Sequence, residues 1–360
     1  MWPHHFASCP RRRSILGFIA SVLLVATVSA ARTEAPLIAP EEIEWMPSSS
    51  FEKDDKKEKP KNRPRMNLSG AACVPTTPKF TSCLIANDEK KYAQFFSIDG
   101  TTLSPLKLIR LSNEDKDPDA EGVAYAEGYF YVAGSHGRSR HGDKDNDASY
   151  AVFRFPVDPA TAMPPFKVTD KKVAAEVESS ARLRKAIKNA CVARDNQPDD
   201  CSIKKLFNQS LAKGGVNIEG IAVKDGRMHF GLRGPSRGGN AYLLSVDAEA
   251  MFKKHANLNS KATSLPLGTD TGIRDLAAVS DGILVLAGPT RKEDVPYAVW
   301  LWDGVGNNAR QLATLDLSGI DGEGKAEVLL PLAEDSSNIR VLVMFDGIEN
   351  GGAVSFMIPR

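Results

Sequence analysis

The hydrophobic positions from about residue 67 onward come in short runs that turn-forming residues separate. Apolar, β-rich runs occupy residues 129–133, 227–230, 283–287 and 339–345. Asp-Gly pairs such as Asp225-Gly226 and Asp281-Gly282 mark turns beside them. Short runs of this composition, bounded by turn residues, are typical of β-strands. The pattern therefore predicts an all-β domain.

These strands recur in a repeating unit. The motif Glu121-Gly122-Val123-Ala124 is echoed at residues 219–222, and looser echoes lie at 69–72, 272–277 and 324–329. The matched apolar positions are Ala71, Val123, Ile221, Leu276 and Val328, with separations of 52, 98, 55 and 52 residues. One insertion of about 45 residues in the second unit would restore a common period of about 53, close to the length of a propeller blade.

Each unit carries four predicted strands, which is the content of one propeller blade. We therefore expect a β-propeller of about five four-stranded blades in residues 67–360, with six blades as the alternative. The last unit stops at Arg360 after three strands. Residues 36–45 are the candidate for a closing strand.

The first 66 residues differ in character from the repeats. Three arginines at 11–13, an apolar stretch over 15–28 and small residues at 28–31 predict a signal peptide in residues 1–30, with an uncleaved anchor as the alternative. Residues 31–66 carry a long charged run and are expected to form a flexible linker. The export segment predicts a periplasmic or secreted protein.

Five cysteines support this location, because Cys9 would leave with the signal peptide. The other four form two close pairs, Cys73/Cys83 and Cys191/Cys201, and an even number in an exported chain predicts two disulfides. Four free thiols are the alternative, and a zinc site is less favoured because neither pair has C-x-x-C spacing. The second pair lies in the insertion, residues 171–213, where apolar positions among many Lys and Arg predict two helices.

The composition excludes some partners. The 46 basic and 45 acidic residues give a net charge of +1, so no overall basic field indicates a nucleic-acid partner or an anionic membrane surface. We expect no membrane span after signal cleavage. The chain also lacks the G-x-S-x-G, H-E-x-x-H and Walker A motifs. Catalytic residues therefore stay unknown.

Repeated charged residues in the first strand of each unit form one candidate ligand-binding site. First strands line the channel of a propeller, so these side chains should converge on its axis. Converging carboxylates repel one another unless protons or a cation such as Ca²⁺ intervene. The alternative is that each acid bonds to the backbone of the next blade and fixes blade spacing. The residues are Glu121, Glu219, Arg274, Asp275 and Glu327.

Two further groups come from the loops. His136, Arg138, Arg237 and Arg291 follow the second strands and could form a cationic ring for phosphate or carboxylate, or else a solvated rim. Asp143, Asp145 and Asp147 alternate like the start of a calcium loop. Since the Gly and the final Glu of an EF-hand are missing, a looser calcium site or a polar loop remain the alternatives.

The two Glu-Gly motifs, the loop Gly134-Ser135-His136 and the signal peptide resemble the bacterial domain-of-unknown-function 3616 family. More distantly, they resemble phytase-like and esterase-like propellers. The resemblance covers about residues 70–360 and implies a propeller with an uncharacterised activity. The fourth and fifth units depart from the motif, with Arg274-Asp275 and Ala326-Glu327, which argues against symmetric ligand binding by all units.

Three functions are compatible with these features. The first is an exported propeller that binds a small anionic ligand or a protein partner at the channel mouth. The second is a calcium-assisted hydrolase of phosphate or carboxylate esters at the same face. The third is an interaction platform that makes contact through residues 171–213.

Overall fold

A computed structural model of the chain describes residues 34–52, 59, 63–75, 80–138, 144–195, 197–320 and 324–360. Its compact unit spans Ala35–Arg360. The predicted signal peptide and Asp143 lie outside the described residues, as does most of the charged run at 53–62.

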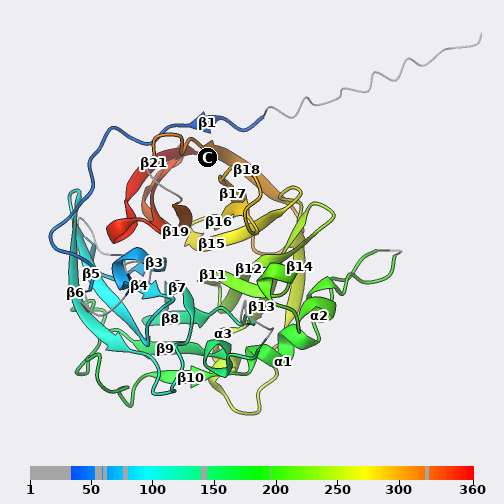
Figure 1. Cartoon of the computed structure of the whole chain (residues 1–360), viewed down its shortest axis with the longest axis horizontal. Coiled ribbons are helices and arrows are strands. Elements are labelled where there is room, and N and C mark those ends of the chain that lie inside the picture. Colours follow the sequence, from blue (N-terminus) through cyan, green and yellow to red (C-terminus); the bar gives the residue numbers. More distant parts are fainter. Residues whose placement is uncertain are drawn as a thin grey trace, which may run out of the picture. The chain divides into compact units, whose positions relative to one another are not determined.

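Five antiparallel sheets follow one another along the chain and surround one axis (Figure 1). Blade one consists of β3 (Leu68–Cys73), β4 (Phe80–Asn87), β5 (Tyr92–Asp99) and β6 (Thr102–Arg110), and blade two of β7 (Ala120–Ala126), β8 (Tyr129–Gly134), β9 (Val152–Pro156) and β10 (Glu178–Ser180). Blade three consists of β11 (Asn217–Lys224), β12 (Arg227–Arg237), β13 (Asn240–Asp247) and β14 (Lys261–Leu265), and blade four of β15 (Thr271–Val279), β16 (Gly282–Pro289), β17 (Ala298–Trp302) and β18 (Ala309–Leu315). Blade five has three strands, β19 (Lys325–Glu334), β20 (Asn338–Asp346) and β21 (Val354–Pro359).

The first strand of every blade is innermost, and each contacts the first strands of both neighbouring blades, including β19 with β3. The ring is therefore closed with five blades. This confirms the predicted propeller and excludes the alternative of six blades. Apolar residues from adjacent blades pack between the sheets. The largest cluster joins blades two and three, and the others join the remaining neighbours.

The N-terminal segment closes the ring differently from the expectation. Residues 36–45 were predicted to supply the missing strand of the last blade. Instead β1 (Leu37–Ile38) pairs in parallel with β18, and β2 (Met46–Pro47) pairs in parallel with β6. Between them Glu41 N–H donates to Ser355 O, and the Trp45 indole N–H donates to Ser355 Oγ at 3.0 Å. The segment thus extends blades four and one and contacts blade five. It therefore stabilises the seam of the ring, which is the junction between the last blades and the first.

The insertion contains two short helices, α1 (Leu183–Lys188) and α2 (Ser202–Leu206). It begins later than predicted, because residues 178–180 form β10 of blade two. The Cys191–Cys201 disulfide joins the two helices, and the Cys73–Cys83 disulfide joins β3 to β4, as predicted. Leu183, Ile187 and Ile203 are buried in the core shared with blades two and three, so the insertion is anchored to the propeller. The remaining helices are α3 (Ala248–Phe252) and the 3-10 turns η2 (Pro64–Met66), η3 (Asp147–Tyr150), η4 (Leu211–Lys213) and η5 (Glu349–Gly351).

Candidate functional site

A ring of polar side chains crosses the channel, one from each first strand. In blades two to five these residues lie at a β-bulge, where two residues of one strand oppose a single residue of the next, and in blade one the bulge falls one residue later. A bulge residue is unpaired in its own sheet, so its side chain is free to turn toward the axis. The ring consists of Ser69, Glu121, Glu219, Arg274 and Glu327.

The residue after the ring position explains the Glu-Gly motif. A Cβ atom on Gly122 would lie 2.9 Å from the backbone N of Ile221, and one on Gly220 would lie 2.6 Å from the backbone N of Leu276. Only glycine allows adjacent first strands to approach this closely. Blade four has Asp275 at this place, and its carboxylate accepts hydrogen bonds from the N–H groups of Leu276 at 2.8 Å and Leu329 at 2.7 Å. Asp275 therefore joins blade four to blade five.

One half of the ring is neutralised by arginines. Arg233 Nη1 lies 2.9 Å from Glu219 Oε1, and Arg274 Nη2 lies 3.3 Å from Glu219 Oε2. Arg274 also forms an ion pair with Glu327. Burial alone would raise the pKa of Glu219, but the two arginines hold that pKa below its ordinary value. Burial, followed by the charge of Glu219, raises the pKa of Glu327 to about 8.

The other half of the ring opens into a pocket of about 950 Å³ at one end of the channel, here named the mouth pocket. Glu121 and Glu219 lie at its base, and Asp88, Asp119 and Asp346 also line it. One carboxylate oxygen each of Asp88, Asp119 and Glu121 lie within 4.8 Å of one another, and we name these three residues the carboxylate triad. Among the described residues, eight acidic ones line the pocket against four basic ones, which are Lys116, Arg138, Lys144 and Lys325.

Local structure holds the triad in place. Asn87 Oδ1 accepts a hydrogen bond from Glu89 N–H, which fixes the turn that presents Asp88. Asp119 has a φ of +51°, a left-handed conformation that Asp tolerates better than most residues, and it accepts a hydrogen bond from Ser135 Oγ. Ser69 Oγ donates to Glu121 Oε2 at 3.0 Å.

Two members of the triad, Glu121 and Asp88, are buried acids that no ion pair among the described residues engages. Burial raises the pKa of Glu121 well above its ordinary value, and Glu219 and Asp119 raise it further. Burial likewise raises the pKa of Asp88, with Asp119 as the nearest contributing charge. The Oδ1 atom of Asp88 is buried and has no hydrogen-bond partner among the described residues. A proton or a cation would relieve this arrangement.

The predicted cationic ring from the loops does not form at the mouth. Of its four residues only Arg138 lines the mouth pocket, where it pairs with Asp145 at 3.0 Å. His136 is buried against Tyr150, and burial lowers its pKa to about 4. Arg237 is exposed at the end of β12, and Arg291 pairs with Glu293. The second strand of each blade lies farther from the axis than the first strand, so the loops that follow second strands lie away from the channel.

The alternating aspartates are also held differently from a calcium loop. Asp145 pairs with Arg184 at 2.9 Å as well as with Arg138, and Asp147 lies 3.4 Å from Arg184. Arginine therefore neutralises both described members of this group.

Sequence reasoning missed several residues of the site, among them Asp119, Arg233 and Asp88. Asp119 stands two residues before Glu121, and its counterpart in the next unit is Asn217. The repetition of a polar residue at this position was a signal that could have identified Asp119. Arg233 follows the second strand motif of unit three without a counterpart in the other units. Asp88 lies in a turn that no repeated pattern singles out.

No curated protein matches the chain. Among the described residues, no helix has the length and apolar character needed to cross a membrane.

The chain is distantly similar to several solved structures. The exo-β-1,3-galactanase of Phanerochaete chrysosporium, with β-1,3-galactotriose, is 9% identical with a TM-score of 0.44, over 81% of this chain and 60% of that one. The PQQ-bound aldose sugar dehydrogenase of Streptomyces coelicolor is 11% identical with a TM-score of 0.38, over 81% and 94%. The calcium-binding protein regucalcin of Agrobacterium tumefaciens is 10% identical with a TM-score of 0.35, over 88% and 95%. Likenesses this distant indicate nothing about activity.

The family described as "protein of unknown function (DUF3616)" matches residues 82–352, which is most of the propeller. The chain belongs to this family.

Proposed function

We propose that this chain is an exported binding protein that holds a calcium ion at the carboxylate triad and uses it to bind a small anionic ligand in the mouth pocket. The observation that carries the proposal is the convergence of Asp88, Asp119 and Glu121 within 4.8 Å, with a buried, unpartnered oxygen on Asp88. Export is supported by the two disulfides, which persist in oxidising compartments.

The chemistry of the triad favours calcium over other cations. Carboxylate oxygens are hard ligands, and calcium accepts six to eight oxygens in flexible geometry, whereas magnesium demands a tight octahedron. Arg233 and Arg274 contact Glu219 and Glu327, whereas no ion pair among the described residues engages Asp88 or Glu121, so a cation at the triad would meet carboxylates that no arginine holds.

A calcium ion held by three carboxylates would keep coordination positions for ligand oxygens. Lys116, Arg138 and Lys144 line the same pocket and add cationic groups around its wall. An anionic ligand would therefore meet the ion at the base of the pocket and basic side chains above it. The ion carries most of this preference for an anionic ligand, because acidic residues outnumber basic ones in the pocket lining.

Titration calorimetry and thermal unfolding with Ca²⁺ and Mg²⁺ test the proposal. Calcium should raise the melting temperature of the wild type, because an ion at about 100 times its Kd stabilises the folded state by about 2.7 kcal/mol. Asp88→Asn and Glu121→Gln should lose this response, and without calcium they should be at least as stable as the wild type, since one repelling charge is gone.

Asp145→Asn is the matched control, because Asp145 lines the same pocket but is paired with arginines. It should keep the calcium response. If calcium does not change the melting temperature of the wild type, the protein has no calcium site. If only Asp145→Asn loses the calcium response, the site lies in the loop that carries Asp145 and not at the triad.

A further inference from the structure

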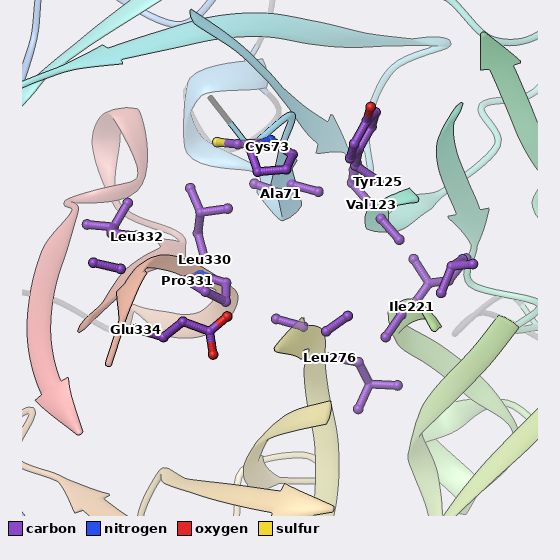
Figure 2. A pocket seen from close by; sticks show the side chains of 18 residues that line it. Ala71, Cys73, Val123, Tyr125, Ile221, Leu276, Leu330, Pro331, Leu332 and Glu334 are labelled. Carbon is purple, nitrogen blue, oxygen red and sulfur yellow. The ribbon is translucent and has the colours of Figure 1, made fainter. Parts of the chain in front are cut away.

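The opposite end of the channel carries a second pocket of very different chemistry. We name it the far pocket; it has a volume of about 270 Å³, and its lining comes from all five first strands. Figure 2 shows Val123, Ile221 and Leu276 reaching toward a common space from separate strands. Of the labelled side chains around it, those with a polar end are Tyr125 and Glu334.

The regular geometry of the blades produces this pocket. Side chains alternate in direction along a strand, and the residues just past the ring position continue toward the far end. In blades two, three and four these are Val123, Ile221 and Leu276, followed by Tyr125, Val223 and Ala278 two positions later. Blade one contributes Ala71 and Cys73, which are small and leave the space open.

Acidic residues lie at the far ends of the first strands of blades two to five, where Lys224 and Arg360 also lie. One of the acids, Glu334, is the last residue of β19 and lines the pocket itself. Each of the others lies in the turn between the first and second strands of its blade, one to three residues beyond the pocket lining. The acidic residues are Glu127, Asp225, Asp281, Glu334 and Asp335, all exposed. Arg360 pairs with Asp281 at 2.6 Å and also with Glu334, whereas no ion pair within the described residues engages Glu127 or Asp225.

We propose that the far pocket is a docking site for a basic polypeptide segment that inserts one aromatic side chain. The size of the pocket supports an aromatic group, because a cavity of about 150 Å³ already accepts benzene. The acidic rim supports basic neighbours on both sides of that group, since complementary charge selects the partner and speeds its encounter. This site is independent of calcium at the mouth.

The test uses defined heptapeptides and the full mature chain. Acetyl-GKKWKKG-amide should bind with a measurable Kd in a titration followed by nuclear magnetic resonance. The same peptide with Ala in place of Trp, and acetyl-GEEWEEG-amide, should bind at least tenfold more weakly. Tryptamine tests a small-molecule ligand. If tryptamine binds as tightly as the basic peptide, the pocket binds a small hydrophobic cation and the polypeptide proposal is wrong.

Variants locate the binding site. Ala333→Trp and Ala278→Trp should fill the pocket from two different strands and weaken binding at least tenfold, because both residues are exposed and line it. Ala160→Trp makes the same change at an exposed turn outside the pocket and should leave the Kd unchanged. Equal Kd values in the filled variants and the wild type would overturn the proposal.

A second pair of variants tests the charge. The double variant Glu127→Lys/Asp225→Lys should weaken binding at least tenfold at low salt, and less at high salt because ions screen exposed charges. Glu176→Lys, at an exposed position that does not line the pocket, is the control. Undiminished binding by the double variant would show that the acidic rim does not select the peptide.

Discussion

Buried carboxylates in the channel should make the metal-free protein less stable as the pH rises from about 5 to about 8. The pKa of Glu327 is about 8 in the folded chain, against an ordinary value of 4.5. A raised folded pKa means that the folded chain binds the proton more tightly than the unfolded chain. Its contribution to stability is therefore complete below about pH 4.5 and is lost as the pH approaches about 8.

The magnitude follows from the difference between the two pKa values. At about 1.4 kcal/mol for each pKa unit, Glu327 alone accounts for about 3 to 5 kcal/mol of unfolding free energy across this range. Glu121 and Asp88 act in the same direction, because burial raises both of their pKa values.

Glu219 acts in the opposite direction, but its pKa lies below 4.5 and its contribution changes only at lower pH. His136 and His229 also act in the opposite direction, because burial lowers the pKa of each to about 4, and their contribution is complete above about pH 6.5. The net loss of stability is therefore expected mainly between about pH 6.5 and about pH 8.

The assay is urea denaturation in EDTA at pH 5, 6.5 and 8. Glu327→Gln should reduce the loss of stability between pH 5 and pH 8, whereas Glu176→Gln, at an exposed position, should not. Calcium should also reduce the loss, because the ion stabilises the ionised triad. Unfolding free energy that is constant or increases from pH 6.5 to pH 8 in EDTA would refute this account of the channel.

Three other substitutions test the contacts that hold the structure. Arg274→Met should cost about 3 to 5 kcal/mol, because it removes the arginine from buried Glu327 and leaves Glu219 with Arg233 alone. Arg237→Met, at an exposed position, should cost little, and urea denaturation compares the two variants. Cys191→Ser with Cys201→Ser should loosen the insertion by about 2 to 3 kcal/mol, which hydrogen exchange of the two helices measures. Trp45→Ala should cost about 3 to 5 kcal/mol, because it empties a buried site and removes a hydrogen bond at the seam; an unchanged melting temperature would show that the segment is dispensable.

The fold was predictable because each blade needs the same local chemistry. Apolar strands and turn residues recur at a nearly constant period, and both disulfides join residues ten positions apart. The alignment failed by one residue in the last unit. Val328 was matched to Val123, but Glu327 occupies the ring position, so the residue two places beyond it, Leu329, is the equivalent, and its N–H bonds to Asp275. Without the Glu-Gly pair, the sequence alone did not show where the bulge falls.

The site was predictable only where it is repeated. The structure places Glu121, Glu219 and Glu327 close together, as the position of first strands in a propeller implied. Asp275 was grouped with these acids, yet its carboxylate bonds to backbone, and the ring position of its blade belongs to Arg274. Asp88 belongs to a turn of blade one alone, so its proximity to Glu121 follows from the packing of blade one against blade two and not from any local pattern.

The difference between the two ends of the channel follows from one short stretch of each first strand. The bulge turns the ring residue toward the mouth, while the residues beyond it, such as Val123 and Ile221, continue the regular alternation toward the far end. Charged side chains therefore gather at one end and apolar ones at the other, although they stand two residues apart in the chain. Blade four has Arg274 at the ring position where blades two, three and five have Glu, and Arg274 forms ion pairs with Glu219 and Glu327. Arg233 adds a second ion pair to Glu219, whereas no ion pair among the described residues engages Glu121 or Asp88, so the proposed cation site lies on the side of these two acids.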